Sequence, residues 1–115
     1  MSEKDVLLNF RLTVLKALAD PVRLEIIEFL KDGEKCVCEI VSAIGKAQST
    51  VSKHLDTLYH ADILEKRVDG RKTLYKVKDV RIFSFLEVLD EFIISQLSSL
   101  AKTIETIKAS EETSR

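Results

Sequence analysis

Residues 63–77, ILEKRVDGRKTLYKV, break the helical spacing that governs the rest of the chain. Apolar and charged residues alternate on both sides of Asp69-Gly70, a pair that favours a tight turn. The pattern predicts a β-hairpin with strands at 63–67 and 72–77. The surrounding sequence has no other alternating stretch, so the chain is expected to be mainly α with a small β-hairpin.

Segments on both sides of this hairpin have apolar residues three or four positions apart, the spacing of helices that bury one face. Asp20-Pro21 is a typical helix start, Gly45 is a typical helix end, and Gly33 is expected to be a left-handed cap. The predicted helices are 6–18, 21–33, 36–44, 48–61 and a long one from after residue 79 to about 107. The residues expected in the core of the second and fourth helices are Leu24, Ile27, Leu30, Val51, Leu55 and Leu58.

The glycine turn IGKAQ joins helix 36–44 to helix 48–61, and the hairpin follows directly. Two helices joined by so short a turn form a helix-turn-helix, and a hairpin after the second helix can act as a wing. The sequence therefore predicts a winged helix-turn-helix, with 48–61 as the helix that reads DNA.

Charge is unevenly distributed along the chain, although the net charge is −1. Residues 46–78 carry eight Lys and Arg against four Asp and Glu, whereas the flanking regions are acidic. A local basic region of this kind favours a nucleic-acid partner. No run reaches the roughly 18 apolar residues of a membrane span, and MSEKDVLLNF does not have the pattern of a signal peptide. We expect a cytoplasmic protein with no membrane partner.

The first half of a reading helix faces the base edges, where Gln, Ser and Thr side chains can make hydrogen bonds. The polar residues predicted to meet DNA from this helix are Gln48, Ser49, Thr50, Ser52, Lys53 and His54. Cationic wing residues predicted to contact phosphates are Arg67, Arg71 and Lys72. The alternative is an ordinary solvated helix and a charged, soluble hairpin tip. Ala47 precedes the reading helix and cannot cap it, so any cap must come from elsewhere.

Cys36 and Cys38 are the two cysteines of the chain, too few for a disulfide framework. In a regular helix, residues two apart point to nearly opposite sides, so these thiols are predicted neither to share a ligand nor to form a mutual disulfide. An agent that joins both sulfurs must unwind the start of helix 36–44 and shift the reading helix packed against it. The alternative is that both cysteines are inert packing residues.

Four stretches resemble the ArsR/SmtB family of metal- and metalloid-responsive repressors: LKALADPVRLEIIEFL, CVCEI, QSTVSKHLDTL and DGRKTLYKV. The resemblance implies a homodimeric repressor that binds a pseudo-palindromic operator and releases it when an inducer binds. Cys36 and Cys38 match the first two ligands of the family's arsenic and antimony sensors. The resemblance therefore implies As(III) or Sb(III) as the inducer, and no obligatory cofactor is expected. Val41 stands where those sensors have a third cysteine, so a two-coordinate methylated arsenical, or arsenic with a ligand from solution, is expected.

The resemblance also implies dimerisation through the first and last helices. Phe92 and Ile94 lie off the main apolar stripe of the last helix, as does Phe83, and this wide face requires a second partner. The predicted organisation is a single winged-helix domain over 1–115, with a DNA-binding core and wing at 19–78, dimerisation helices at 1–18 and 79–108, and a frayed tail at 109–115.

Several alternatives to a metalloid-triggered repressor stay open at this level. The same thiols can support a redox-responsive regulator, and a winged helix can bind DNA without a small-molecule trigger or bind protein instead. An enzyme or metallochaperone using the Cys-Val-Cys motif is not expected, because no general base accompanies the thiols.

Overall fold

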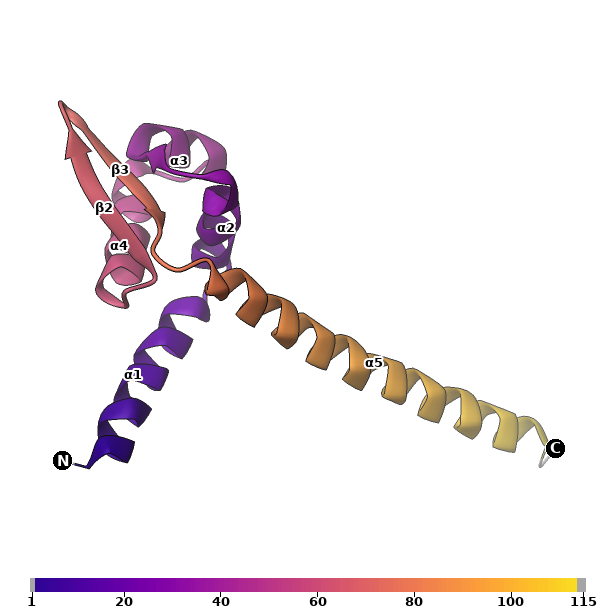
Figure 1. The fold of residues 1–115 in the computed structure, drawn as a ribbon. Helices are drawn as coiled ribbons and strands as arrows, with labels where there is room; N and C mark the ends of the chain where they lie inside the picture. Colours follow the sequence, from indigo (N-terminus) through magenta and orange to yellow (C-terminus); the bar gives the residue numbers. More distant parts are fainter. Residues whose placement is uncertain (1, 114–115) are drawn as a thin grey trace. The chain divides into compact units, whose positions relative to one another are not determined.

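The computed structural model describes residues 2–113 and has a mainly helical fold with a small antiparallel sheet (Figure 1). The elements in chain order are α1 (Glu3–Leu18), α2 (Pro21–Phe29), the 3-10 turn η1 (Leu30–Asp32), β1 (Lys35–Cys36), α3 (Val37–Ile44), α4 (Gln48–His60), β2 (Leu64–Asp69), β3 (Lys72–Val77) and α5 (Arg81–Thr113). The predicted fold class is confirmed as a winged helix-turn-helix. The chain divides into two compact units, one ending at Val80 and the other beginning at Arg81, and each is described by itself.

The start of α2 follows directly from the sequence. Asp20 has an extended backbone, and its Oδ1 accepts hydrogen bonds from the backbone N–H groups of Val22 at 2.8 Å and Arg23 at 3.1 Å. Pro21 occupies the first turn, where its missing N–H costs nothing. The predicted end of this helix at Gly33 is wrong. The α-helix α2 ends at Phe29, and the next residues form the 3-10 turn η1. Gly33 then has φ 137° and ψ −173°, which is not the left-handed cap that was expected.

The helix-turn-helix consists of α3 and α4, joined through Gly45. Gly45 is left-handed, with φ 72°, and its N–H bonds to the Val41 carbonyl at 3.0 Å. This geometry ends α3 at the predicted residue and lets the chain reverse into α4.

The core lies between α2, α3, α4 and the sheet. Val51, Leu55 and Leu58 of α4 are fully buried, as predicted, and each is worth about 1.5–3 kcal/mol relative to exposure. In α2 the expectation for Leu24 is wrong, because 39% of it is exposed, whereas Ile26 is fully buried beside Ile27. The remaining fully buried large side chains are Ile40 and Leu64.

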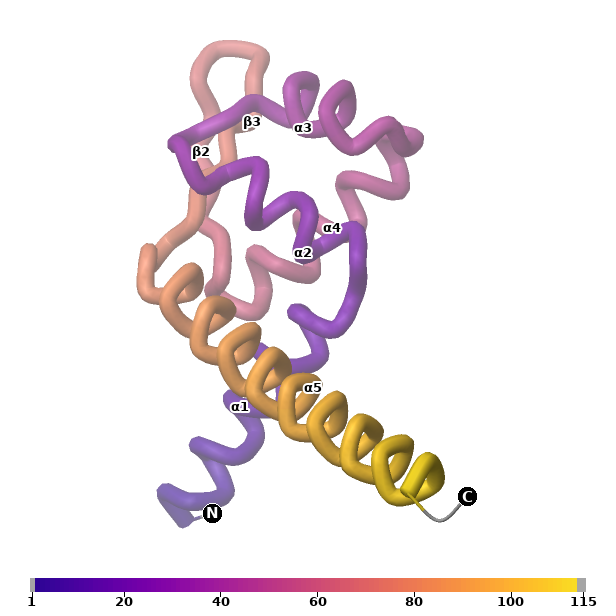
Figure 2. The backbone as a smooth tube through the Cα atoms, turned by 90° about the vertical axis from the view of Figure 1, so that its right-hand side faces the viewer, coloured from indigo at the N-terminus to yellow at the C-terminus, as the bar shows by residue number. Residues whose placement is uncertain are grey.

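The sheet has three strands in the order β1-β3-β2, all antiparallel. The wing strands β2 and β3 lie side by side in both views (Figures 1 and 2). β2 continues past the predicted end to Asp69, so Gly70-Arg71 forms the two-residue turn in place of the predicted Asp69-Gly70. Gly70 has φ 64°, which a residue without Cβ adopts most readily. The third strand, β1, was not predicted; it pairs Lys35 with Tyr75 and Cys36 with Leu74.

The second unit consists of α5. This helix runs to Thr113, beyond the predicted end at residue 108, so residues 109–113 of the expected frayed tail are helical and 114–115 lie outside the described residues. α5 has no buried residue, and its exposed apolar side chains include Phe92 at 62% and Ile94 at 61%. Within residues 2–113, no helix combines the length and the apolar character that crossing a membrane requires.

Candidate nucleic-acid interface and thiol site

The two thiols lie at the junction of β1 and α3, and the structure joins them as a disulfide. The prediction that they could not pair is wrong, because Cys36 is not in the helix. Cys36 is the N-cap of α3 with φ −77° and ψ 159°, an extended conformation, and Cys38 is in the first helical turn. This change of backbone direction brings the two Cα atoms to 5.4 Å, inside the usual range for a disulfide.

Cys36 also caps α3. Its Sγ accepts a hydrogen bond from the Glu39 backbone N–H at 3.4 Å, and the Cys36 N–H donates to Glu39 Oε1 at 3.1 Å. The pair is a capping box in which sulfur replaces the usual hydroxyl. Glu39, three residues after Cys36, is the sequence signal that could have placed the helix start correctly. Cys36 is only 3% exposed, whereas Cys38 is exposed.

Both cysteines open onto one pocket of about 560 Å³. Its walls come from the start of α3, the outer face of α4 and the tip of the wing; the lining residues are Cys36, Val37, Cys38, Val41, Gln48, Ser52, Asp56, Arg71, Lys72, Thr73 and Tyr75. The thiols and four of the predicted DNA-contacting residues therefore border the same space.

The pocket is lined by two sulfur atoms and by side chains of both charges, Asp56 being acidic and Arg71 and Lys72 basic. Burial, together with the nearby negative charge of Asp56, raises the pKa of Tyr75 above its ordinary value, so its hydroxyl stays neutral. Among residues 2–113, no group of three or more His, Cys, Asp or Glu side chains could hold a metal ion. Cys36 and Cys38 contribute two sulfur atoms to the lining of this pocket, joined to each other in this structure.

Half of the six predicted DNA-reading residues of α4 are exposed to solvent. Gln48, Ser49 and Lys53 are exposed, and Thr50 and Ser52 are half-buried. Ala47 makes no side-chain cap to α4, as expected from its methyl group. At the wing, Arg71 and Lys72 are exposed beside the turn.

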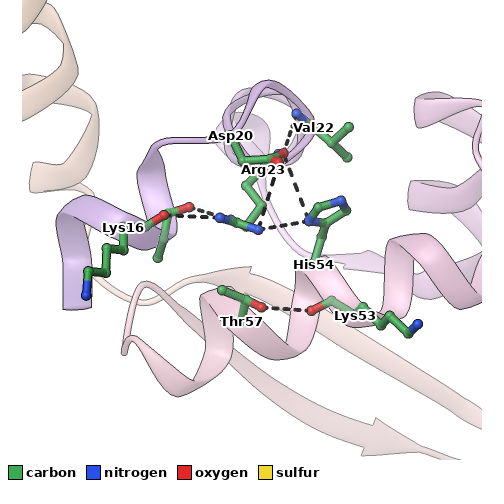
Figure 3. Close-up of polar contacts among 8 residues, drawn as sticks. Lys16, Asp20, Val22, Arg23, Lys53, His54 and Thr57 are labelled. Carbon is green, nitrogen blue, oxygen red and sulfur yellow. Dashed lines mark hydrogen bonds and ion pairs between the residues drawn. The ribbon is translucent and has the colours of Figure 1, made fainter. Parts of the chain in front are cut away.

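His54 does not face outward with the others. Its Nδ1 lies 3.1 Å from an Arg23 guanidinium nitrogen and 4.0 Å from Asp20 Oδ1, and its side chain is 18% exposed. Figure 3 shows the ring directed toward the start of α2. A base contact from His54 is not what this geometry favours. The Arg23 and Asp20 partners were missed because they lie far from His54 in sequence.

Arg67 is engaged within the protein. Its Nε and a terminal nitrogen donate to the two oxygens of Glu34 at 3.0 and 2.7 Å, a bidentate pair between β2 and the residue before β1. The hydrogen bonds from Arg67 hold the pKa of the Glu34 carboxyl below its usual value, and Glu34 raises the pKa of Arg67. The sequence analysis did not predict Glu34 as a partner of Arg67. Because Arg67 is paired with Glu34, its guanidinium is not free to contact a DNA phosphate as predicted.

Comparisons with known proteins agree with this geometry. The profile of a family described as "Bacterial regulatory protein, arsR family" matches residues 20–66. An HTH-type transcriptional regulator of Methanocaldococcus jannaschii is 37% identical over 79 residues, which is 68% of this chain and 89% of that protein. The arsenical resistance operon repressor of Staphylococcus aureus is 29% identical over 94 residues, 82% of this chain and 90% of that protein. The homodimeric winged helix-turn-helix DNA-binding domain of a possible ArsR-family regulator from Mycobacterium bovis superposes with a TM-score of 0.74 at 30% identity, covering 84% of this chain and 93% of that one.

Proposed function

We propose that this chain, which belongs to the ArsR family of transcriptional regulators, is a homodimeric repressor whose operator is released when trivalent arsenic or antimony binds Cys36 and Cys38. The observation that carries the proposal is the shared pocket: the two sulfurs border the same space as Gln48 and Ser52 of α4 and the wing cations. A ligand bound at the sulfurs therefore acts where DNA is expected.

On the DNA side, α4 enters the major groove and the wing contacts the backbone. Gln48, Ser49, Thr50 and Ser52 supply hydrogen-bonding groups for base edges or phosphates, and Lys53 a phosphate contact. Arg71 and Lys72 at the wing turn supply sequence-independent attraction to phosphates. Arg67 holds the wing in place through its pair with Glu34 and does not contact DNA. His54 contacts Arg23 within the protein and does not contact DNA either.

On the ligand side, both sulfurs must be reduced. Each thiol loses its proton and replaces one oxygen ligand of As(III), and the oxygen leaves as water; no electron is transferred. The third position on arsenic is filled from solution or by a methyl group. Soft thiolate donors favour such ions over harder cations.

The link between ligand and DNA release lies at Cys36. Its sulfur caps α3, and its backbone pairs with Leu74 on the wing strand β3. The cap is present while this sulfur is joined to Cys38, so the bond itself does not abolish it. Arsenic bound between the two sulfurs changes their separation, and the change falls at the residue that both caps α3 and joins the sheet. A shift of Cys36 is expected to move α3, which packs against α4, and also β3, which pairs with Cys36.

The test is fluorescence-anisotropy titration with the promoter region of the protein's own gene at fixed salt. Reduced wild type is expected to bind, and arsenite or antimonyl tartrate to release it. A Cys36→Ser/Cys38→Ser variant holds no thiol, since the chain has two cysteines, and is expected to bind but not respond. Equal release of both proteins by arsenite would overturn the assignment of the trigger, and absence of specific binding would overturn the repressor itself.

A second candidate trigger is oxidation, favoured by the Cys36–Cys38 disulfide in the structure. A peroxide takes two electrons and two protons from the thiols, the disulfide forms and water is released. Release of the reduced complex by peroxide, reversed by dithiothreitol and absent in the double serine variant, would favour this trigger. An oxidised protein that still binds DNA but ignores arsenite would favour the metalloid trigger.

A further inference from the structure

Arg23 lies where three helices of the first unit meet. Its Nε donates to the Ala17 carbonyl at 2.6 Å and a terminal nitrogen donates to the Lys16 carbonyl at 3.1 Å, so it caps the end of α1. Its other terminal nitrogen lies 3.1 Å from His54 Nδ1 on α4 (Figure 3). A planar guanidinium with five fixed donors can hold both sides at once, which an ammonium group cannot match.

The contact with His54 has a defined direction. Arg has donors only, so a hydrogen bond between these two side chains requires His54 Nδ1 to be the acceptor. Asp20 steadies the arginine: its Oδ1 accepts from the Arg23 backbone N–H at 3.1 Å, and its Oδ2 is 4.0 Å from the guanidinium. Both side chains of the Arg23–His54 contact are less than one-fifth exposed.

This bridge is placed to fix the angle of the reading helix. The buried side chains of α4, Val51, Leu55 and Leu58, hold it by apolar packing, which has little directional preference. The hydrogen bond from Arg23 is directional, and it joins α4 to the last turn of α1. His54 directly follows Lys53, within the same helix as the proposed DNA contacts.

We propose that Arg23 and His54 are positioning residues that hold the recognition helix in register with α1 and that neither contacts DNA. The inference rests on the proposed DNA-binding function and is independent of the thiol trigger. α1 exposes apolar side chains such as Phe10 and is expected to lie in the dimer interface, so the bridge sets how the two reading helices of a dimer are spaced for two half-sites.

The experiment compares near-isosteric replacements of His54 in the full chain. The Asn oxygen in His54→Asn falls near the position of Nδ1 and keeps the acceptor, whereas the Gln oxygen in His54→Gln falls near Nε2 and does not. Operator affinity is measured by anisotropy over a series of salt concentrations, and folding is checked by thermal denaturation. We expect His54→Asn to bind within about threefold of wild type and His54→Gln to bind about tenfold more weakly, the effect of losing one hydrogen bond to a charged group.

A double-mutant cycle separates positioning from direct contact. Arg23→Gln also removes the hydrogen bonds to the Ala17 and Lys16 carbonyls, so it is expected to weaken binding at least as much as His54→Gln. Adding His54→Gln to Arg23→Gln should weaken binding no further, because the bridge is already lost. The slope of log affinity against log salt should stay at the wild-type value, since no phosphate contact is lost.

Three outcomes would overturn the inference. Losses that multiply in the double variant would mean that His54 acts on DNA independently of Arg23. Equal binding by His54→Asn and His54→Gln, both folded, would mean that the acceptor position is irrelevant. A weakening that only follows lower thermal stability, with Asn and Gln alike, would reduce the bridge to a structural role. Failure of wild type to bind would instead refute the proposed function on which the inference rests.

Discussion

Cys36 shows how much one residue can carry in this protein. It ends β1, caps α3 through its sulfur and forms one of the two thiol ligands proposed for the inducer. Cys38 has only the last of these roles and is exposed. The two cysteines are therefore expected to differ in stability experiments even where they are equivalent in sensing.

Replacing Cys36 separates capping from thiol chemistry. Under reducing conditions Cys36→Ser should leave the stability near that of wild type, because a hydroxyl is the preferred N-cap acceptor. Cys36→Ala should cost about 1 kcal/mol, because the Glu39 N–H loses its acceptor. Urea unfolding followed by circular dichroism measures both. Cys38→Ser and Cys38→Ala serve as the matched pair, and a difference between them as large as that at Cys36 would contradict the capping role.

Glu34 gives the wing a dependence on pH. Its pKa is lowered chiefly by hydrogen bonds from Arg67, so the ionised form is favoured in the folded state. The stabilisation is present above the ordinary pKa of 4.5 and is lost as the pH falls through the lower folded value. Wild type should therefore be more stable than Glu34→Gln at pH 7, and the difference should shrink as the pH falls below 4.5. When Arg67 is replaced by Gln, the further change Glu34→Gln should alter the stability little at any pH. If Glu34→Gln alters the stability as much without Arg67 as with it, the Arg67–Glu34 pair is not the cause.

At the scale of elements, the sequence predicted every long helix and the hairpin, because their spacing and caps are local. Asp20-Pro21 and Gly45 marked boundaries that the structure confirms. β1 escaped prediction because two residues are too short to show an alternating pattern. Its absence from the prediction put Cys36 inside a helix and led to the wrong geometry for the thiols.

The polar contacts of the site could not be predicted for a different reason. The Arg67–Glu34 pair spans 33 positions and the Arg23–His54 contact spans 31, so neither has a local sequence signal. Their residue types are compatible with surface exposure or DNA contact, and only the folded chain shows which partner each one meets.

The wing makes a prediction of its own. Arg71→Gln should weaken operator binding to a similar extent for all sequences, and it should make the salt slope less negative by about 0.9, as expected for one lost phosphate contact. Lys78→Gln is the control, because Lys78 pairs with Asp62 at 3.1 Å below the wing. A salt slope that changes equally in both variants would contradict a specific role for the wing tip.

At the scale of the whole molecule, α1 and α5 each carry an apolar surface exposed to solvent. Phe10 of α1 is 63% exposed and Leu97 of α5 is 60% exposed, values that a stable chain rarely leaves uncovered over so many residues. We predict that a second copy of the chain covers them, in keeping with the homodimeric M. bovis relative.

Disrupting α5 tests this assembly. Leu97→Glu/Leu100→Glu should give a monomer in sedimentation velocity, and operator affinity should fall by about 100-fold or more because two linked half-sites become independent. Ser98→Glu, on an exposed polar position of the same helix, should stay dimeric and bind normally. A Leu97→Glu/Leu100→Glu protein that remains a dimer would place the interface elsewhere.

The most direct test of the thiol-triggered repressor is an arsenite titration of the reduced protein–operator complex. DNA release by anisotropy and the ultraviolet absorption of arsenic–thiolate bonds are recorded in the same cuvette. We predict that the two signals rise together and saturate at one arsenic per protomer, and that both are lost in Cys36→Ser and in Cys38→Ser. Arsenic–thiolate bonds that form without release of DNA would contradict the account.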